Sequence, residues 1–128
     1  MKHQELTDRI ICCFYTVYNQ LGYGFLEKVY ENAMLIELMK AGLKVRAQAP
    51  IVVKYGGLTV GEYQADLLIE ELVIVELKAT RTLAAEHQAQ LLNYLRATKV
   101  EVGLLLNFGP KAEIKRLVFD NHKKMGHG

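Results

Sequence analysis

The chain has 128 residues, of which 51% are hydrophobic and 23% charged, and its formal net charge is +2. These values are typical of one globular domain that buries its core without disulfide or metal staples. No run of 18 uncharged apolar residues is present, which argues against a membrane span, and the charged residues near the N-terminus argue against a signal peptide. We therefore expect a cytoplasmic protein.

The charges are unevenly distributed along the chain. Residues 1–77 hold 7 Lys+Arg and 10 Asp+Glu, whereas residues 78–128 hold 9 and 4. A basic face contributed by the C-terminal part is one interpretation, and an ordinary solvated surface is the other.

Cysteine and serine usage excludes two kinds of chemistry. The two cysteines, Cys12 and Cys13, are adjacent and cannot complete a four-cysteine metal site, so they are interpreted as small buried residues. The chain contains no serine, which excludes a serine nucleophile.

Hydrophobic periodicity and turn residues predict eight elements along one domain. The expected order is a helix over 5–20, a helix over 25–41, strands over 49–55, 58–69 and 72–79, a helix over 84–98, and strands over 100–108 and 113–119. A helix that connects two strands of one sheet implies that these strands are parallel and the sheet mixed. We expect a three-layer α/β/α domain with its core over about residues 5–119, and a tail over 120–128.

The predicted hairpin ADLLIEELVIVELKA (residues 65–79) carries charges inside apolar strands, namely Asp66, Glu76 and Lys78. Charged side chains are seldom buried unless they are paired or bind a metal. A two-residue Glu70-Glu71 turn would place Asp66 and Glu76 on opposite faces of the sheet, whereas a three-residue loop or a bulge would place them directly opposite each other. We predict the second geometry.

Two neighbouring carboxylates repel each other unless a cation lies between them. Hard oxygen ligands suit Mg²⁺ or Mn²⁺, and the Leu77 carbonyl is a candidate third ligand beside Asp66 and Glu76. Lys78 shares a strand face with Glu76, where it could hold an attacking water or offset developing negative charge. The alternative is a structural ion pair between Lys78 and one of the two carboxylates.

Two helical stretches carry further polar residues. GFLEKVY (24–30) places Glu27 and Tyr30 one turn apart at a helix start, where Glu27 would also interact favourably with the helix dipole. HQAQLLNYL (87–95) aligns His87, Gln90 and Tyr94 on one helix face. Core packing for Tyr94, solvent exposure for Gln90 and a structural role for His87 are the alternatives.

Asp66, then Glu76-Leu77-Lys78, then Gln90-x-x-x-Tyr94 in the following helix together resemble the PD-(D/E)XK nuclease superfamily, in its RecB/λ-exonuclease-like branch. GFLEKVY is similar to the motif Gly-x-x-Glu-x-x-Tyr of a small bacterial branch, the GxxExxY proteins. The resemblance covers about residues 5–119, including the element order. Ala65 stands where the superfamily's name has proline.

The resemblance implies a restriction-endonuclease-like fold and a role for each motif residue. Expected ligands of Mg²⁺ or Mn²⁺ are Asp66, Glu76, the Leu77 carbonyl and Glu27, the last as a ligand or through a metal-bound water. Expected catalytic and substrate-binding residues are Lys78 for the nucleophile, Gln90 to orient Lys78 or water, Tyr94 on the substrate phosphate, and Tyr30 and Arg81 as further substrate contacts.

Two functions are compatible with these patterns. The first is a divalent-metal-dependent nuclease that acts on DNA or RNA, with DNA favoured, and the intact acids and lysine support it. The second is a non-catalytic module of the same fold that binds nucleic acid or protein. We expect no membrane partner and weak sequence specificity, and a homodimer is compatible with the sequence.

Overall fold

The computed structural model describes residues 1–124 and contains all eight expected elements in the expected order. They are α1 (Gln4–Leu21), α2 (Glu27–Lys40), β1 (Val45–Tyr55), β2 (Leu58–Ile69), β3 (Val73–Lys78), α3 (Ala85–Ala97), β4 (Val102–Phe108) and β5 (Ala112–Val118). β1 begins earlier than predicted, and a short 3-10 helix, Asn121–Lys123, lies in the predicted tail. The rest of that tail, residues 125–128, lies outside the described residues.

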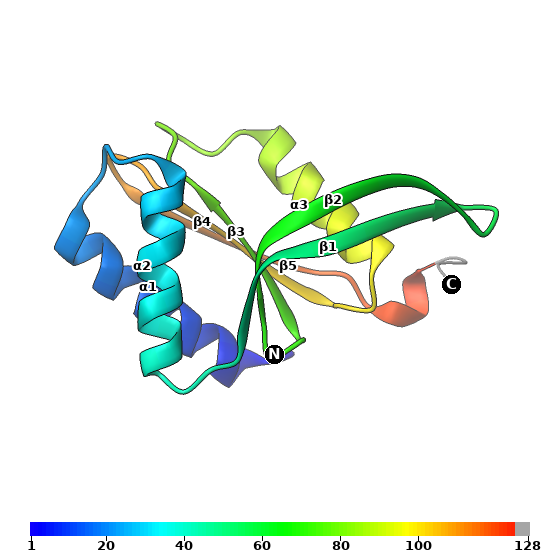
Figure 1. Cartoon of the computed structure of the whole chain (residues 1–128), viewed down its shortest axis with the longest axis horizontal. Helices are drawn as coiled ribbons and strands as arrows, with labels where there is room; N and C mark the ends of the chain where they lie inside the picture. Colours follow the sequence, from blue (N-terminus) through cyan, green and yellow to red (C-terminus); the bar gives the residue numbers. More distant parts are fainter. Residues whose placement is uncertain (125–128) are drawn as a thin grey trace.

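The five strands form one mixed sheet in the order β1-β2-β3-β4-β5 (Figure 1). β1–β2, β2–β3 and β4–β5 are antiparallel, whereas β3 and β4 are parallel because α3 carries the chain from one to the start of the other. Every residue of β4 is buried, which confirms the prediction of a strand covered on both faces.

The helices divide between the two faces of the sheet, which confirms the three-layer prediction (Figure 1). α1 and α2 pack on one face, against side chains such as Val75, Leu77 and Leu106. α3 packs on the other face, against side chains such as Ile74 and Leu105. Alternate residues of β3 and β4 thus face opposite layers, as the period of two in a strand requires.

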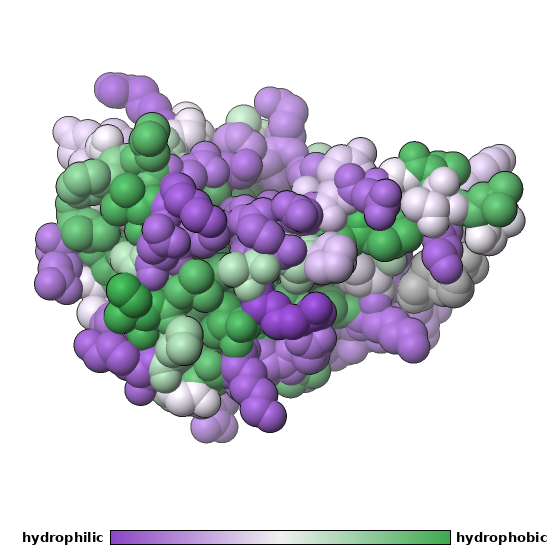
Figure 2. All heavy atoms as spheres, in the orientation of Figure 1, coloured by the Kyte–Doolittle hydropathy of each residue, from purple (hydrophilic) through white to green (hydrophobic). Residues whose placement is uncertain are grey.

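The outer half of the β1–β2 hairpin extends past the rest of the sheet and lies beside α3 (Figure 1). A register shift between Val53 and Lys54 interrupts the ladder of this hairpin. Tyr55 and Leu58, at its tip, are 79% and 73% exposed. Figure 2 shows hydrophobic side chains at this end of the molecule and hydrophilic side chains between it and the helical end.

Within residues 1–124, no helix has both the length and the apolar character needed to cross a membrane.

Gly103, in β4, sets the approach of α3 to the sheet. A Cβ built at Gly103 would lie 2.8 Å from Leu91 Cδ1 and 3.0 Å from Leu91 Cγ, inside van der Waals contact. Because Leu91 is fully buried, it has little room to move.

We expect Gly103→Ala to lower the free energy of unfolding by about 1–3 kcal/mol, measured by urea denaturation. Gly61→Ala is the matched control, since a Cβ there meets its nearest neighbour at an ordinary 3.5 Å. Equal stability of the two variants would show that Leu91 repacks freely.

Candidate functional site

The β2–β3 connection sets the relation between the two carboxylates. The ladder pairs Ile69 with Val73 and Leu67 with Val75, which leaves a three-residue loop over 70–72. Continuing this register places Asp66 opposite Glu76. The predicted three-residue loop is therefore confirmed.

Beyond the Leu67–Val75 pair, carboxylates replace the backbone partners of the ladder. The Asp66 N–H donates to the Glu76 carboxylate at 2.7 Å, and the Leu77 N–H donates to the Asp66 carboxylate at 2.8 Å. Each acidic side chain thus accepts a hydrogen bond from the backbone of the other strand. The two carboxylates are held between β2 and β3 by main-chain donors that belong to the sheet itself.

An irregularity in β1 lies directly beside this gap. The β1–β2 ladder pairs Ala47 with Leu67 and Ala49 with Ala65, so Gln48 lies opposite Asp66, yet these two residues do not form a ladder pair. Gln48 has a left-handed backbone, with φ of +53°, which is uncommon for a residue other than glycine. The missing pair is consistent with the Asp66 N–H pointing toward Glu76 instead of β1. Such strained residues are frequent at functional sites.

Glu31 is a site residue that the sequence interpretation missed. It is 5% exposed, and its carboxylate accepts hydrogen bonds from Lys28 Nζ and from Gln48 Nε2, each at 2.7 Å. The pattern Glu27–Glu31 was a usable signal, because residues four apart share one helix face. Through Gln48, Glu31 connects α2 to the irregular position in β1.

The two carboxylates share an unfavourable environment. Burial raises the pKa of Asp66, with further increases from the negative charges of Glu31 and Glu27. Burial, and then repulsion from Asp66, raises the pKa of Glu76 to about 8. The backbone N–H donors and the Lys78 ammonium oppose these shifts without cancelling them. The folded chain alone therefore retains a proton on this pair near neutral pH.

The donor set fits a hard divalent cation. Leu77 directs its N–H toward Asp66, and in a strand the carbonyl of a residue points to the same side as its N–H. The gap therefore presents two carboxylates and one main-chain carbonyl, a set that Mg²⁺ or Mn²⁺ completes with water and phosphate oxygens. Within residues 1–124, no three Asp, Glu, His or Cys side chains are grouped closely enough to hold a metal.

Lys78 and α3 border the same gap. Lys78 is half-buried, and its positive charge lowers the pKa of both Asp66 and Glu76. Over residues 1–124 its ammonium forms no hydrogen bond or ion pair, so the structural ion pair considered from the sequence is not formed. Gln90 Nε2 donates to the Tyr94 hydroxyl at 3.1 Å, and within residues 1–124 no hydrogen bond joins Gln90 to Lys78. Burial and the neighbouring Glu76 charge raise the pKa of Tyr94.

Tyr30, expected to contact substrate, occupies a structural position in the core. It is fully buried and stacks on Phe108 with ring centroids 4.1 Å apart. Its hydroxyl donates to the Gly22 carbonyl at 2.7 Å and accepts from the Phe25 N–H at 3.3 Å. Tyr30 thus fixes the loop that leads to Glu27, which is the exposed first residue of α2.

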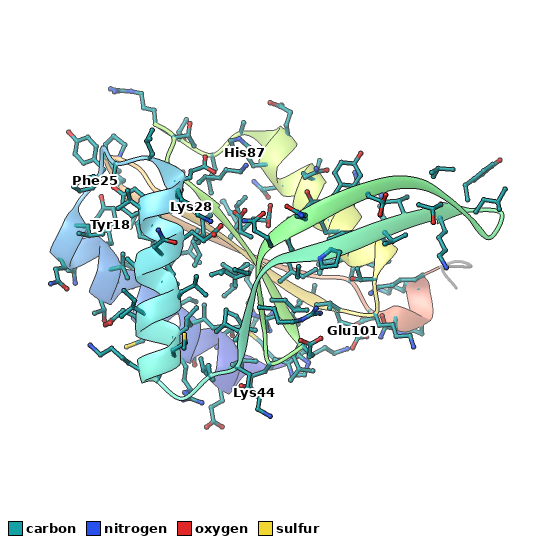
Figure 3. All side chains as sticks on the ribbon, in the orientation of Figure 1. Tyr18, Phe25, Lys28, Lys44, His87 and Glu101 are labelled. Carbon is teal, nitrogen blue, oxygen red and sulfur yellow. The ribbon has the colours of Figure 1, made fainter. Side chains whose placement is uncertain are left out.

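His87 and Arg81 lie on either side of the start of α3. His87 Nδ1 accepts the Ala84 N–H at 3.0 Å and so caps the helix, which is the structural role considered for it (Figure 3). Arg81 is exposed in the loop that follows β3. That loop is held by the fully buried Asn107, which exchanges hydrogen bonds with the Thr80 backbone. Asn107 is a second residue that sequence interpretation missed.

The fold and the paired carboxylates define a class of protein, and a family model agrees with it. The model of the PD-(D/E)XK nuclease superfamily matches residues 4–117, so the chain belongs to this superfamily. Its resemblance to the GxxExxY branch is not tested by that match.

Among solved structures, the chain is similar to SSO0001, known from a crystal structure. The TM-score is 0.50 at 16% identity, and the alignment covers 73% of this chain and 50% of the other. At this identity the similarity shows the fold alone, and this chain spans half the length of SSO0001. A comparison with curated protein sequences gave no significant match.

The raised pKa of Glu76 predicts that stability falls as pH rises. Its pKa is about 8 in the folded chain against an ordinary value of 4.5, so the folded state binds more protons than the unfolded state between these values. The stabilisation is fully present below about pH 4.5 and is lost as pH rises through 8. We expect Glu76→Gln to flatten this decline, which amounts to a few kcal/mol, in urea denaturation measured from pH 5 to 9 without divalent cations.

Glu62→Gln, at an exposed position of β2, is the control and should keep the wild-type pH profile. An unchanged profile in Glu76→Gln would show that the carboxyl group of Glu76 does not take up the proton.

Proposed function

We propose that this chain hydrolyses phosphodiester bonds of nucleic acid with the help of Mg²⁺ or Mn²⁺, and that DNA is preferred over RNA. The observation that carries the proposal is the pair of carboxylates between two strands, with Glu76 buried and Asp66 half-buried, and with a main-chain carbonyl and the Lys78 ammonium beside them. Membership of a nuclease superfamily supports the same conclusion.

In the proposed mechanism, Asp66, Glu76 and the Leu77 carbonyl would hold the cation, and the cation would supply polarisation of the phosphate and a lower pKa of water. The Lys78 ammonium orients the attacking water and offsets the negative charge that develops on the phosphate oxygens. It is suited to this role because it is close enough to lower the pKa of both carboxylates, and because within residues 1–124 it forms no ion pair.

The helices supply the remaining proposed roles. Glu27, exposed at the first position of α2, would contribute a ligand or hold a metal-bound water. Gln90 orients the Tyr94 hydroxyl, to which it donates a hydrogen bond, and Tyr94 contacts a substrate phosphate. Arg81, exposed after β3, contacts a more distant phosphate. Tyr30 is left out of this set because it is fully buried.

We also propose that the chain is a member of the GxxExxY branch. Gly24, Glu27 and Tyr30 have the required spacing, and the buried Tyr30 hydroxyl fixes the loop that presents Glu27. A homodimer is a further proposal, which light scattering after gel filtration would test.

Lys78→Ala should reduce the cleavage rate at least about a hundredfold, because it removes the group that offsets transition-state charge. The measurement is a time course on labelled single- and double-stranded DNA and RNA in Mg²⁺, Mn²⁺ or EDTA. Lys115→Ala, at an exposed position of β5, is the matched control and should cut like wild type. Undiminished cleavage by Lys78→Ala would contradict the mechanism.

Asp66→Asn should weaken Mn²⁺ binding more than about tenfold, measured by titration calorimetry at pH 8, because one of two ligand carboxylates is lost. Lys78→Ala should keep wild-type affinity within a few-fold, and Asp8→Asn on α1 is the control. Metal bound at Asp66 with no cleavage of any substrate would favour the non-catalytic binding module. Equal Mn²⁺ affinity of Asp66→Asn and wild type would contradict the assigned metal site.

A further inference from the structure

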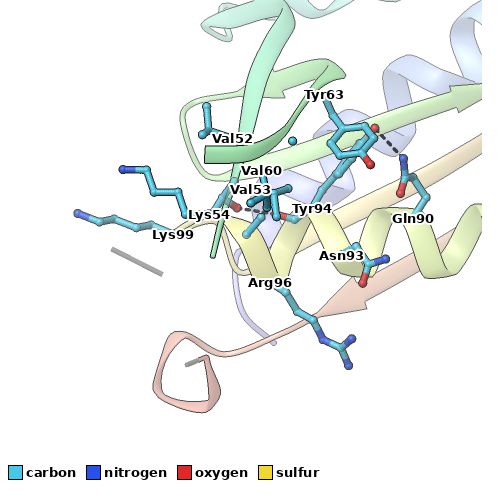
Figure 4. Close-up of a pocket in the computed structure, with 13 residues that line it drawn as sticks. Val52, Val53, Lys54, Val60, Tyr63, Gln90, Asn93, Tyr94, Arg96 and Lys99 are labelled. Carbon is cyan, nitrogen blue, oxygen red and sulfur yellow. Dashed lines mark hydrogen bonds between the residues drawn. The ribbon is translucent and has the colours of Figure 1, made fainter. Parts of the chain in front are cut away.

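A groove of about 630 Å³ lies between the β1–β2 hairpin and α3 (Figure 4). The hairpin forms one wall, and Gln90, Tyr94 and the residues that follow them on α3 form the other. It is separate from the gap that holds the two carboxylates, and the proposed mechanism uses only its Gln90–Tyr94 end.

The charged groups of the groove are all positive. Its lining contains Lys54, Arg96 and Lys99, and no lining residue is acidic. Figure 4 shows Lys54 and Lys99 extending to the same side at the end remote from Gln90. Arg96 is partly engaged, since its guanidinium lies 5.3 Å from the centre of the Phe119 ring. Lys54 and Lys99 are therefore the cations best placed for an anionic ligand.

The wall between those lysines and Tyr94 is apolar and aromatic. Val52 and Val60 are 37% and 64% exposed, and Tyr63 is 48% exposed although it is a large ring on a strand. The Tyr63 and Tyr94 rings lie 5.8 Å apart between centroids, with an interplanar angle of 47°. Tyr63 is thus supported on one side by Tyr94 and open on the other, as a stacking platform requires.

Two α3 residues of the candidate site, Gln90 and Tyr94, also line the groove. Tyr94 lines the groove, and burial and then the charges of Glu76 and Asp66 raise its pKa, so its hydroxyl lies near the two carboxylates. Gln90 lines the groove as well and bonds to that hydroxyl. A chain bound along the groove would therefore lead into the gap at Asp66 and Glu76.

We propose that this groove binds a single strand of nucleic acid, with a base stacked on Tyr63 and phosphates near Lys54 and Lys99. The inference rests on the proposed function and names its substrate class. Proteins bind single strands with aromatic side chains, on which the accessible base faces stack, and with basic side chains near the phosphates. In a duplex the base faces stack on one another, so the apolar wall would have no partner there. An acidic peptide carries negative charge, as a nucleic-acid strand does, but it has no planar base in each repeating unit to stack on Tyr63.

The test is fluorescence anisotropy with labelled ten-nucleotide oligo(dT) and oligo(U), and with a duplex of mixed sequence, all in EDTA. We expect single strands to bind more tightly than the duplex. Tyr63→Ala should weaken single-strand binding about tenfold through loss of stacking. Tyr15→Ala on α1, where the tyrosine is 41% exposed, is the matched control and should bind like wild type.

A salt titration tests the lysines separately. For single strands, the slope of log affinity against log salt concentration changes by about 0.7 for each phosphate contact. We expect Lys54→Gln and Lys99→Gln each to make the slope shallower by about that amount, and Lys40→Gln on α2 to leave it unchanged. Equal thermal melting of all variants ensures that the comparison reports binding and not folding.

Three results would overturn the inference: equal effects of groove and control variants, equal or tighter binding of the duplex, or a dimer in light scattering that Tyr63→Ala disrupts. The last would make this face an interface between copies of the chain. Because binding is measured in EDTA, the binding result does not depend on whether the chain has nuclease activity. Conversely, if Tyr63→Ala binds like its control while the wild-type chain still cleaves in a metal-dependent way, this inference fails and the proposed function stands.

Discussion

The placement of two carboxylates between adjacent strands, Glu76 buried and Asp66 half-buried, is the constraint on which the rest of the site depends. Asp66 and Glu76 each accept a main-chain N–H from the opposite strand, and this arrangement requires the ladder to end after Leu67 and Val75. The three-residue loop at 70–72 sets the register that brings them together. The left-handed Gln48 lies where β1 fails to pair with Asp66. Local backbone geometry thus creates the acidic gap.

The same arrangement opposes stability. Burial raises the pKa of both carboxyl groups, so the chain without a cation folds best when the pair is protonated. A divalent cation would remove the repulsion that the sheet imposes. Destabilised sites of this kind are a common cost of function, and hydrophobic layers on both faces of the sheet provide the compensating stability.

The three-layer arrangement also explains why the site has two unlike sides. From one layer, α2 supplies Glu27 and Glu31, and their negative charges act on Asp66. From the other layer, α3 supplies Gln90 and Tyr94, which lead away into the groove beside the hairpin. Gly103 lets α3 pack closely on β4, and Asn107 fixes the loop between β3 and α3.

Hydrophobic periodicity and turn residues determined the eight elements, because apolar patterns follow directly from which face is buried. The helix between two strands then determined the mixed sheet and the three layers. The candidate site with Asp66, Glu76 and Lys78 was predictable because charged side chains are seldom placed inside apolar strands unless they are paired or bind a metal. Only the tertiary structure decided that Tyr30 is buried, that Glu31 accepts a hydrogen bond from Gln48 and that Tyr63 borders a groove. These depend on contacts between segments distant in sequence, where a tyrosine or glutamate has the same local pattern whether it packs, pairs or faces solvent.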